Sequence, residues 1–351
     1  MEEPHICQPK TRVWLIVVVL GVGCLVLAVH AWRYMPFFSD DALISLRYAE
    51  RLTEGHGLTW NDGERVEGYS NLLWLLLCAG LGSLGIDLIT AARILGFLGM
   101  AAVFGAILYA FRPTRLANAP PGLIAILLVA LSGPTAVWAI GGLEQPLLAG
   151  LLAWSVAILV RRFEHPDRPL GQLLAAGTVL GLIAVTRADG LLLCGLLCAS
   201  YSLACGISFG AVKQTAVLAV PALLFSAAQL IFRLSYYGEW APNTALVKVA
   251  LTRHHADLGL LYLSRGLTAF LPLLILSGAA ALTTLWHARS RRKLVLLIVP
   301  VVLWPAYLVV VGGDIFPAHR RLLVLVVLLG FVVAQGLTWL EQRSCPGSQE
   351  S

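Results

Sequence analysis

Charged residues are scarce in this chain of 351 residues. Asp, Glu, Lys and Arg make up only 13% of it, whereas hydrophobic residues make up 58%, and the mean hydropathy is +0.82. Because soluble globular domains carry about 25% charged residues, this composition excludes an ordinary soluble domain. Apolar runs of about 17 to 25 residues, the length that crosses a bilayer, recur almost to the C-terminus. The composition predicts an all-α polytopic membrane protein.

The chain also lacks the signatures of several common kinds of site. Its seven cysteines lie mainly within apolar runs and include no CxxC pair, so we expect no disulfide framework. The adjacent His254 and His255 do not have a zinc-binding HExxH spacing, and no Rossmann signature for a nucleotide sugar is present. The formal charge of +6 is spread over loops and helix ends. This spread argues against nucleic acid and favours membrane lipid as a partner.

Ten apolar segments are predicted to cross the membrane. They are 13–32, 90–111, 121–139, 143–160, 170–186, 189–206, 214–233, 262–286, 294–311 and 321–340. We therefore expect one integral membrane domain over 1–343 and a short polar tail over 344–351. Basic residues precede the first run, and no small-residue cleavage site follows it. These features predict an uncleaved first span with its N-terminus in the cytoplasm.

The segment 71–85 decides the topology. It has about fifteen residues and three glycines, which is short for a crossing. If it does not cross, the basic cluster at 289–293 falls on the cytoplasmic side, as the positive-inside rule requires, and the polar loops all share the outer side. We therefore predict a re-entrant or juxtamembrane helix at 71–85, within a first outer loop that spans 33–89.

This first outer loop begins with an acidic pair. Ser39 is a plausible N-cap for a helix whose first turn holds Asp40 and Asp41, and Arg47 lies on the same face as Asp40. Acids at a helix N-terminus are favoured by the helix dipole alone. Carboxylates at membrane depth are also typical of functional sites, where they act as a general base or bind a divalent cation. Both interpretations remain open from the residues.

Other polar residues of the predicted outer face are candidates for substrate contacts. The loop after the first helix is rich in turn residues, and its His56, Trp60 and Tyr69 offer the hydrogen-bonding and stacking surfaces that sugars use. The full set of substrate-binding candidates is His56, Trp60, Glu67, Tyr69, Asn71, Glu144, Asp189, Asn243, Lys248 and Asp314. Structural alternatives are a helix N-terminal charge for Glu144 and an ion pair between Arg187 and Asp189.

The stretch SDDALISLRYAERLTEGHGLTWNDGERVEGYSNLLW resembles the first outer loop of the GT-C glycosyltransferases, in the bacterial branch that includes the mycobacterial terminal arabinofuranosyltransferases. The later motifs GGLEQP, TRADG, APNTALVKV and GGDIFPAHRRLLV follow in the order of that branch. The resemblance implies a GT-C fold with juxtamembrane helices in the first outer loop. It also implies a polyprenyl-phosphate-linked sugar donor and a glycan or glycolipid acceptor on the outer side of the bacterial cytoplasmic membrane.

The resulting hypothesis is an inverting sugar transfer by direct displacement. An aspartate, Asp40 in the first place and Asp41 in the second, deprotonates the acceptor or binds a divalent cation such as Mg²⁺, Mn²⁺ or Ca²⁺. The candidates for binding the donor phosphate are Arg47, Arg187 and Arg320, because guanidinium groups match phosphate geometry. The alternatives are a transporter or flippase of a lipid-linked or anionic solute, and a noncatalytic membrane scaffold.

Overall fold

The computed structural model describes residues 13–111, 121–165, 169–206, 208–243, 253–285 and 287–343. All regular secondary structure within these ranges is helical, which confirms the predicted all-α class. The helices are α1 (Val13–Trp32), α2 (Asp40–Thr53), α3 (Leu72–Gly82), α4 (Leu88–Ala110), α5 (Pro121–Ala130), α6 (Gly133–Ile140), α7 (Gln145–Glu164), α8 (Gly171–Thr186), α9 (Gly190–Cys205), α10 (Phe209–Tyr237), α12 (Arg253–Ala269), α13 (Leu271–Leu285), α14 (Ala288–Val310), the 3-10 helix η1 (Pro317–Leu322) and α15 (Leu323–Arg343).

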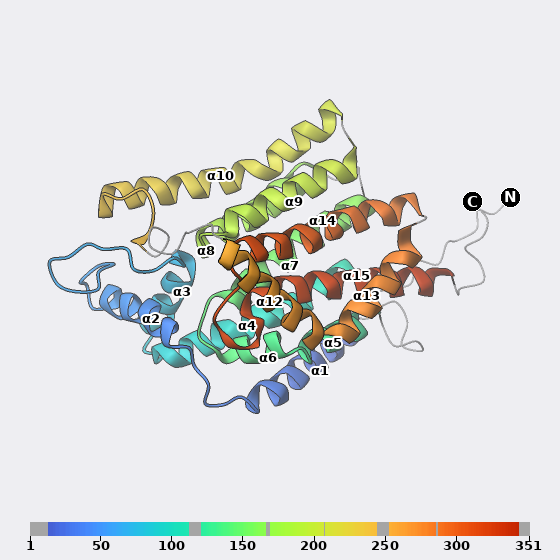
Figure 1. Cartoon of the computed structure of the whole chain (residues 1–351). Coiled ribbons are helices and arrows are strands. Elements are labelled where there is room, and N and C mark those ends of the chain that lie inside the picture. The colour runs from blue at the N-terminus through green and yellow to red at the C-terminus, as the bar shows by residue number, and fades with distance from the viewer. Residues whose placement is uncertain are drawn as a thin grey trace.

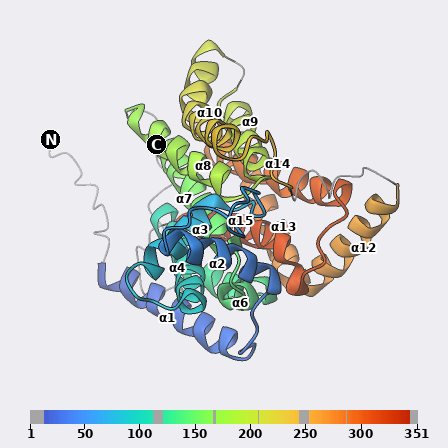
Figure 2. The ribbon, with the colours of Figure 1, turned by 90° about the vertical axis from the view of Figure 1, so that its left-hand side faces the viewer.

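The long helices run roughly along one direction, so that the bundle has two distinct ends (Figure 1). The helices α2 and α3 lie at the end that we call the loop end, at the left of Figure 1. The helix α1 begins, and α15 finishes, at the opposite end. Seen from the loop end, α10 lies at the periphery of the bundle (Figure 2).

Six helices are long and apolar enough to cross a membrane by length and composition, and the number rises to eight if each of two bent pairs is one span. This confirms a multi-pass membrane protein. The helices α8 and α9 are apolar, but each has only 16 residues. The predicted total of ten spans would need both of them and both bent pairs, and it stays a prediction.

Two predicted spans are not straight. The predicted span 121–139 is divided into α5 and α6, which meet at an angle of 65°, and 262–286 is interrupted between α12 and α13, which meet at 81°. A proline stands in the first turn of each second helix, at Pro134 and Pro272. Proline has no backbone N–H and its ring clashes with the preceding turn, so it favours a break at these positions. The helices α10 and α14, by contrast, continue through internal prolines.

The segment 71–85 forms the short helix α3 of 11 residues. At 1.5 Å per residue it is about 16 Å long, roughly half the hydrocarbon thickness of a bilayer. Its Trp74 and Leu75 are fully buried and pack with Leu46 and Tyr48 of α2. The structure therefore confirms juxtamembrane helices in the first loop, with α3 packed against α2.

The centre of the bundle is α15, in which every residue from 323 to 336 is buried. A helix that is apolar on all sides lies either in a protein core or in a membrane, and the burial of α15 shows that it lies in the core. By contrast, α10 is largely exposed along its most apolar stretch, as expected of a helix that faces lipid. The buried helix α15 therefore fixes the position of η1, which directly precedes it. The helix η1 contains part of the last predicted motif, GGDIFPAHRRLLV.

Candidate active site

The start of α2 is docked on the connection between α6 and α7. The backbone N–H of Ser39 donates to the carbonyl oxygen of Gly141 at 3.0 Å. Gly142 has a φ of +85°, and a Cβ placed there would lie 2.3 Å from the ring of Phe38. Only glycine fits this close approach and this left-handed conformation. The connection therefore fixes the position of the helix that begins with Asp40.

A chain of buried hydrogen bonds leads from α2 to α7. The hydroxyl of Ser45 donates to Asn71 Oδ1 at 3.0 Å, and Asn71 Nδ2 donates to Glu144 Oε2 at 2.9 Å. All three residues are buried. Asn71 precedes α3 and Glu144 precedes α7, so this chain of contacts joins three elements at the loop end.

Arg187 stands at the centre of the charged residues. Its Nη1 donates to Glu144 Oε1 in an ion pair, while Nε and Nη2 donate to the two carboxylate oxygens of Asp189 at 2.7 and 3.0 Å. Tyr307 also donates to Asp189, at 3.5 Å. The side chains of Arg187, Glu144 and Asp189 are only 5 to 11% exposed. The predicted ion pair between Arg187 and Asp189 is therefore present, and it extends to Glu144.

A second buried ion pair comes from the segment before α15. Arg320 Nε and Nη2 donate to the carboxylate of Asp314 at 2.9 and 3.4 Å. The guanidinium of Arg320 also lies 4.1 Å from the ring centre of Phe316 and 5.4 Å from that of Trp138. Aromatic faces attract a cation at such distances. These contacts hold Arg320 from several sides.

Arg321 differs from its neighbour. Its backbone is fixed, because its N–H donates to the hydroxyl of Tyr262 at 3.2 Å and its carbonyl accepts from Trp304 Nε1 at 2.9 Å. Its Nε is 4.0 Å from Asp314 Oδ2 and is buried without a hydrogen-bond partner among the described residues. Buried donors are usually paired, so Arg321 keeps hydrogen-bonding capacity at this site.

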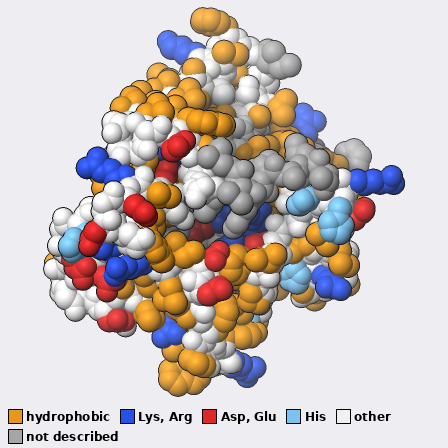
Figure 3. Space-filling view, turned by 60° about the vertical axis from the view of Figure 1, so that its left-hand side comes forward, with side chains coloured by type: hydrophobic (Ala, Val, Ile, Leu, Met, Phe, Trp, Pro, Cys, Tyr) orange, Lys and Arg blue, Asp and Glu red, His pale blue; other side chains and the backbone are white. Residues whose placement is uncertain are grey.

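We refer to these six residues as the charged cluster. Its members are Glu144, Arg187, Asp189, Asp314, Arg320 and Arg321. Basic and acidic side chains lie together in a hollow near the centre of the face in Figure 3.

The arginines keep the buried carboxylates of the charged cluster ionised. Burial alone raises the pKa of Glu144, but Arg187, Arg320 and the hydrogen bond from Asn71 hold that pKa below its ordinary value. Burial likewise raises the pKa of Asp189, and Arg187, with Arg321 and Arg320, lowers it below the usual value for aspartate. The arginines of η1 thus act on carboxylates that stand before α7 and α9, so the cluster is one electrostatic unit.

The acidic pair Asp40 and Asp41 lies at the N-terminus of α2. Asp40 is exposed, and its Oδ1 accepts a hydrogen bond of 2.9 Å from the backbone N–H of Asp41. Asp41 is half-buried. Within the described ranges neither forms an ion pair, and no three His, Cys, Asp or Glu residues come together in a group that could hold a metal ion.

Glu67, Tyr69 and Asn243 lie in a separate contact, between the first loop and the end of α10. Glu67 pairs with Arg233, whose Nη2 donates to Oε1 at 3.1 Å. The hydroxyls of Tyr69 and Tyr237 are 3.0 Å apart. The backbone N–H of Asn243 donates to the carbonyl of Glu67 at 3.2 Å, and its side chain is exposed. These contacts hold the loop on α10.

Three further candidates lie on the outer surface of the first loop. The ring of His56 is 3.8 Å from Asp62 Oδ1 and is half exposed. The ring of Trp60 lies against Tyr48, with 5.9 Å between ring centres. Arg47 forms an ion pair of 2.7 Å with Glu50, and both side chains are nearly half exposed.

None of these three joins the charged cluster through a contact that the structure records. Lys248, the remaining candidate, lies outside the described residues.

Several residues of this region could not be singled out from the sequence. Tyr307 and Trp138 lie within apolar stretches, so the sequence suggests only core aromatics. In the structure Tyr307 donates to Asp189, and Trp138 donates to the carbonyl oxygen of Pro317. Nothing in the sequence of α2 distinguishes Ser45 from an ordinary polar residue of a helix. The signal that could have identified Tyr307 and Trp138 is a side chain with a polar atom inside an apolar run, because such atoms in membrane segments are often functional.

The fold that carries this site is shared with solved structures. ArnT from Cupriavidus metallidurans bound to undecaprenyl phosphate superposes with a TM-score of 0.66 at 16% identity, over 94% of this chain and 62% of that one. The archaeal oligosaccharyltransferase AglB from Archaeoglobus fulgidus, in complex with an inhibitory peptide and a dolichol-phosphate, superposes with a TM-score of 0.60 at 12% identity, over 96% and 52%. The chain therefore has a GT-C-like fold.

Two curated proteins are similar in sequence. The terminal β-(1→2)-arabinofuranosyltransferase of Mycobacterium tuberculosis is 27% identical over 270 residues, which is 73% of this chain and 41% of that protein. The protein of the same name from Corynebacterium glutamicum is 28% identical over 239 residues, or 61% and 33%. The chain thus spans less than half the length of these relatives. No family model matches it. The predicted resemblance to this branch is confirmed.

Proposed function

We propose that the chain is a membrane glycosyltransferase that transfers a sugar from a polyprenyl-phosphate donor to a glycan or glycolipid acceptor of the cell envelope. The observation that carries this proposal is the clustering of three arginines with three carboxylates at the loop end, where five of the six side chains are at most 11% exposed. The helix α2 presents Asp40 and Asp41 at the same end. The names of the two sequence relatives support sugar transfer. The lipid phosphates in the solved structures of similar fold support the class of donor.

The donor phosphate is assigned first to Arg321. Its side chain is 21% exposed, more than those of Arg187 and Arg320, and guanidinium groups bind phosphate oxygens with a fixed, planar geometry. Arg187 and Arg320 already donate to carboxylates, so we expect them to contribute mainly positive charge. Arg47, which pairs with Glu50 on the surface of α2, is the weakest of the arginine candidates.

We assign the general base to Asp41 ahead of Asp40. Residues four apart share a face of a helix, and Asp41 is four residues before Ser45, which is buried and bonded to Asn71. Asp40 shares its face with Leu43 and Arg47, which are exposed or half exposed. This supports Asp41, which shares its face of α2 with the residue that is linked to Glu144 through Asn71, whereas Asp40 is exposed.

The chemistry follows from these positions. The carboxylate of Asp41 accepts the proton of the acceptor hydroxyl, whose oxygen forms a bond to the anomeric carbon of the donor sugar. The bond from that carbon to the phosphate oxygen breaks, so the configuration inverts and polyprenyl phosphate leaves with the electron pair. Arginines that are already fixed near the leaving oxygen stabilise its charge without reorganising. A positioned general base contributes roughly 100-fold to 10,000-fold to such a reaction.

A divalent cation, Mg²⁺, Mn²⁺ or Ca²⁺, is part of the proposal. Magnesium is commonly held by one or two carboxylates together with substrate phosphate oxygens, and Asp40 and Asp41 are two carboxylates without ion-pair partners among the described residues. When bound there, the cation would neutralise charge on the donor phosphate. A structure of the oligosaccharyltransferase of similar fold contains Zn and sulfate.

We also propose that the protein lies in the bacterial cytoplasmic membrane with its N-terminus inside and its loop end outside. Arg291, Arg292 and Lys293 begin α14 at the end opposite to α2 and α3, and short cytoplasmic loops collect such residues. A reporter fused near Asp87 tests the orientation, because Asp87 lies at the end of the first loop, directly before α4. A cytoplasmic signal at this position would contradict it.

The decisive experiment uses purified protein in a neutral detergent and polyprenyl-phosphate-linked sugars. We expect release of free polyprenyl phosphate, measured by chromatography, and its loss in the double variant Asp40→Asn with Asp41→Asn. Glu50→Gln on the same helix is the matched control and should keep wild-type turnover. Full activity of the double variant would overturn the catalytic assignment. The transporter or flippase alternative is not favoured, and movement of intact donor across vesicles without cleavage would restore it.

A further inference from the structure

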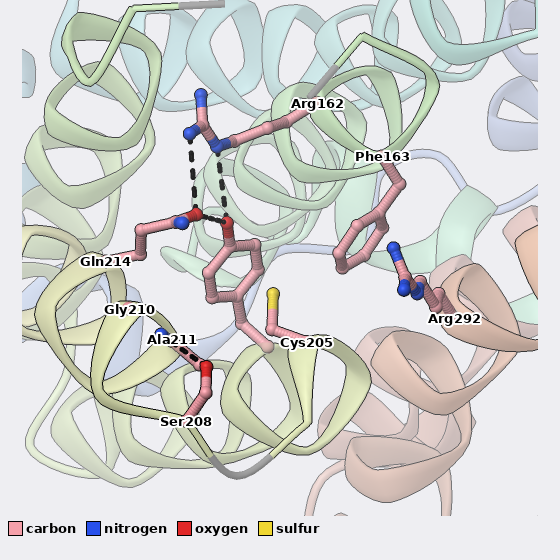
Figure 4. Close-up of a pocket in the computed structure, with 9 residues that line it drawn as sticks. Arg162, Phe163, Cys205, Ser208, Gly210, Ala211, Gln214 and Arg292 are labelled. Carbon is pink, nitrogen blue, oxygen red and sulfur yellow. Dashed lines mark hydrogen bonds between the residues drawn. The ribbon is translucent and has the colours of Figure 1, made fainter. Parts of the chain in front are cut away.

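A second polar site lies at the end of the bundle opposite to the charged cluster. Here a cavity of about 210 Å³ opens where α7 and α9 end and where α10 and α14 begin (Figure 4). An adjoining cavity of about 280 Å³ shares Cys205 and Arg292 with the first. Nothing in the proposed sugar transfer uses this end of the molecule.

The back wall of the first cavity is held by side-chain hydrogen bonds. The hydroxyl of Tyr201 donates to Gln214 Oε1 at 2.8 Å. Arg162 donates to that hydroxyl at 3.2 Å and to Gln214 Oε1 at 3.4 Å, as Figure 4 draws. The ring of Phe163 is stacked on Tyr201, with 5.5 Å between ring centres. These contacts link α7, α9 and α10, so side chains of three helices form the wall.

The mouth of the site is basic. Arg292 reaches both cavities from α14, and Arg291 reaches the second. Both side chains are exposed, and neither forms an ion pair with any described residue. Their neighbours differ, since Arg161 and Lys293 each pair with Glu164 at 2.6 Å. No acidic side chain is among the described residues that line the two cavities.

The first turn of α10 adds to the positive potential. Ser208 caps this helix by accepting a hydrogen bond from the N–H of Ala211 at 3.1 Å, and Ser208, Gly210 and Ala211 line the first cavity. The N-terminus of a helix carries a partial positive charge. This potential acts together with the two arginines in the same space, so the site as a whole attracts an anion.

Apolar side chains stand directly beside this basic mouth. Leu203 and Val295 line the second cavity. Leu203 is 56% exposed and Phe209, at the start of α10, is 87% exposed. In a membrane protein such surfaces are in contact with acyl chains. A ligand that matches both parts of the site is amphiphilic, with an anionic head group and an apolar tail.

We propose that this site binds an anionic phospholipid through its phosphate group. Arg292 and Arg291 contact the phosphate, the first turn of α10 faces it, and the acyl chains lie along Leu203 and Phe209. Basic pockets between membrane helices are suited to such head groups. The bound lipid would tie the start of α14 to α9 and α10. The site is distinct from the charged cluster, so lipid binding can be measured in the absence of sugar transfer.

The test is a lipid titration monitored by the thermal unfolding of the full chain in a neutral detergent. The probes are dioctanoylphosphatidylglycerol, dioctanoylphosphatidylcholine and inorganic phosphate. We expect a saturable rise in the unfolding temperature with phosphatidylglycerol, none with phosphatidylcholine, and an effect of inorganic phosphate only at far higher concentration. The double variant Arg291→Ala with Arg292→Ala should bind phosphatidylglycerol about tenfold more weakly or worse.

Arg343→Ala is the matched control, because Arg343 is an exposed arginine at the same end that lines neither cavity. It should keep the wild-type response, and Arg292→Lys should keep part of it because the charge remains. Unchanged binding in the double variant overturns the site. An equal response to phosphatidylcholine would show that the site does not require an anionic head group. An equal response to inorganic phosphate would show that the site binds free phosphate and not a lipid. None of these results bears on sugar transfer at the loop end.

Discussion

The side-chain amide of Asn71 donates a hydrogen bond of 2.9 Å to the carboxylate of Glu144, and this contact joins the first loop to the charged cluster. Asn71 also accepts from Ser45 on α2. Because Glu144 is paired with Arg187, a displacement of α2 would be transmitted to the arginine at the centre of the cluster. The position of the acidic pair and the position of the arginines are therefore coupled.

The first prediction separates the two aspartates. Asp41→Asn should lower the rate of sugar transfer by at least about 100-fold, because it removes the proposed general base. Asp40→Asn should have a smaller effect, since Asp40 shares its face of α2 with exposed residues. Single-turnover rates at saturating donor measure both effects, with Glu50→Gln as the control. A larger loss in Asp40→Asn would reverse the assignment.

The second prediction concerns stability. Arg187→Met should lower the free energy of unfolding by about 3 to 5 kcal/mol, because it leaves the buried carboxylates of Glu144 and Asp189 without their main partner. Arg47→Met is the matched control. Its pair with Glu50 is nearly half exposed, and surface pairs contribute about 0 to 1 kcal/mol. Equal losses in the two variants, measured by denaturant or thermal unfolding, would contradict the buried network.

The third prediction concerns donor binding. Arg321→Ala should raise the KM for the polyprenyl-phosphate donor by about tenfold or more, since a hydrogen bond to a charged group contributes roughly 1.5 to 3 kcal/mol. Arg321→Lys should recover only part of the affinity because lysine lacks the planar guanidinium. Arg265→Ala, an exposed arginine of α12, serves as the control. If Arg321→Ala changes only the unfolding temperature, its role is structural.

The fourth prediction concerns pH. The pKa of Glu144 lies below its ordinary 4.5 in the folded protein, and that of Asp189 lies below 3.8. The folded state thus binds fewer protons than the unfolded state, so the stability from these groups is fully present above those ordinary values. It is lost as the pH falls through the lower folded-state pKa values.

The measurement compares the wild type with Glu144→Gln. The difference in their free energies of unfolding should be constant from about pH 8 down to about pH 5 and should shrink at lower pH. A difference that grows on acidification would mean that the pKa of Glu144 is raised in the folded protein.

The fifth prediction tests the docking of α2. Gly142→Ala and Gly85→Ala both place a Cβ at a left-handed φ, of +85° and +83°, which costs about 1 to 2 kcal/mol. Only at Gly142 does the new Cβ also meet Phe38 and Ala42, whereas nothing lies within 4 Å at Gly85. Gly142→Ala should therefore reduce transfer activity as well as stability, and Gly85→Ala should reduce stability alone. Equal activity in the two variants would argue against docking as the determinant.

Much of the fold could be predicted from hydropathy and charge. The length of 71–85 and the placement of basic residues were enough to identify α3 as a helix that does not need to cross. The two bent pairs were not predicted, because an apolar run has the same composition whether it is straight or broken. A proline, Pro134 or Pro272, follows each break. It could not have located the breaks by itself, because α10 and α14 continue through prolines of their own.

The candidate site was predicted less completely, and the reason is the pairing of charges. The sequence identifies Arg187 and Arg320 as candidate cations and offers Asp189 as a partner of Arg187, but it does not show which other charges are paired. That depends on contacts between residues far apart in the chain, such as Glu144 with Arg187. The sequence could not separate the proposed roles of Asp40 and Asp41 for a similar reason, because the exposure of each depends on contacts with distant residues. The face of α2 that is buried is set by Asn71 and by the Gly141–Gly142 connection.

The charged cluster contains three arginines and three carboxylates, so its formal charges cancel. Such a cluster is electrically neutral without substrate, which limits the energetic cost of keeping it out of water. An incoming phosphate makes it anionic, and a low-dielectric site disfavours an excess of either sign. If the proposed donor binds at this cluster, a cation bound with it would offset the added negative charge. The affinity for the proposed donor should then rise with the concentration of that cation.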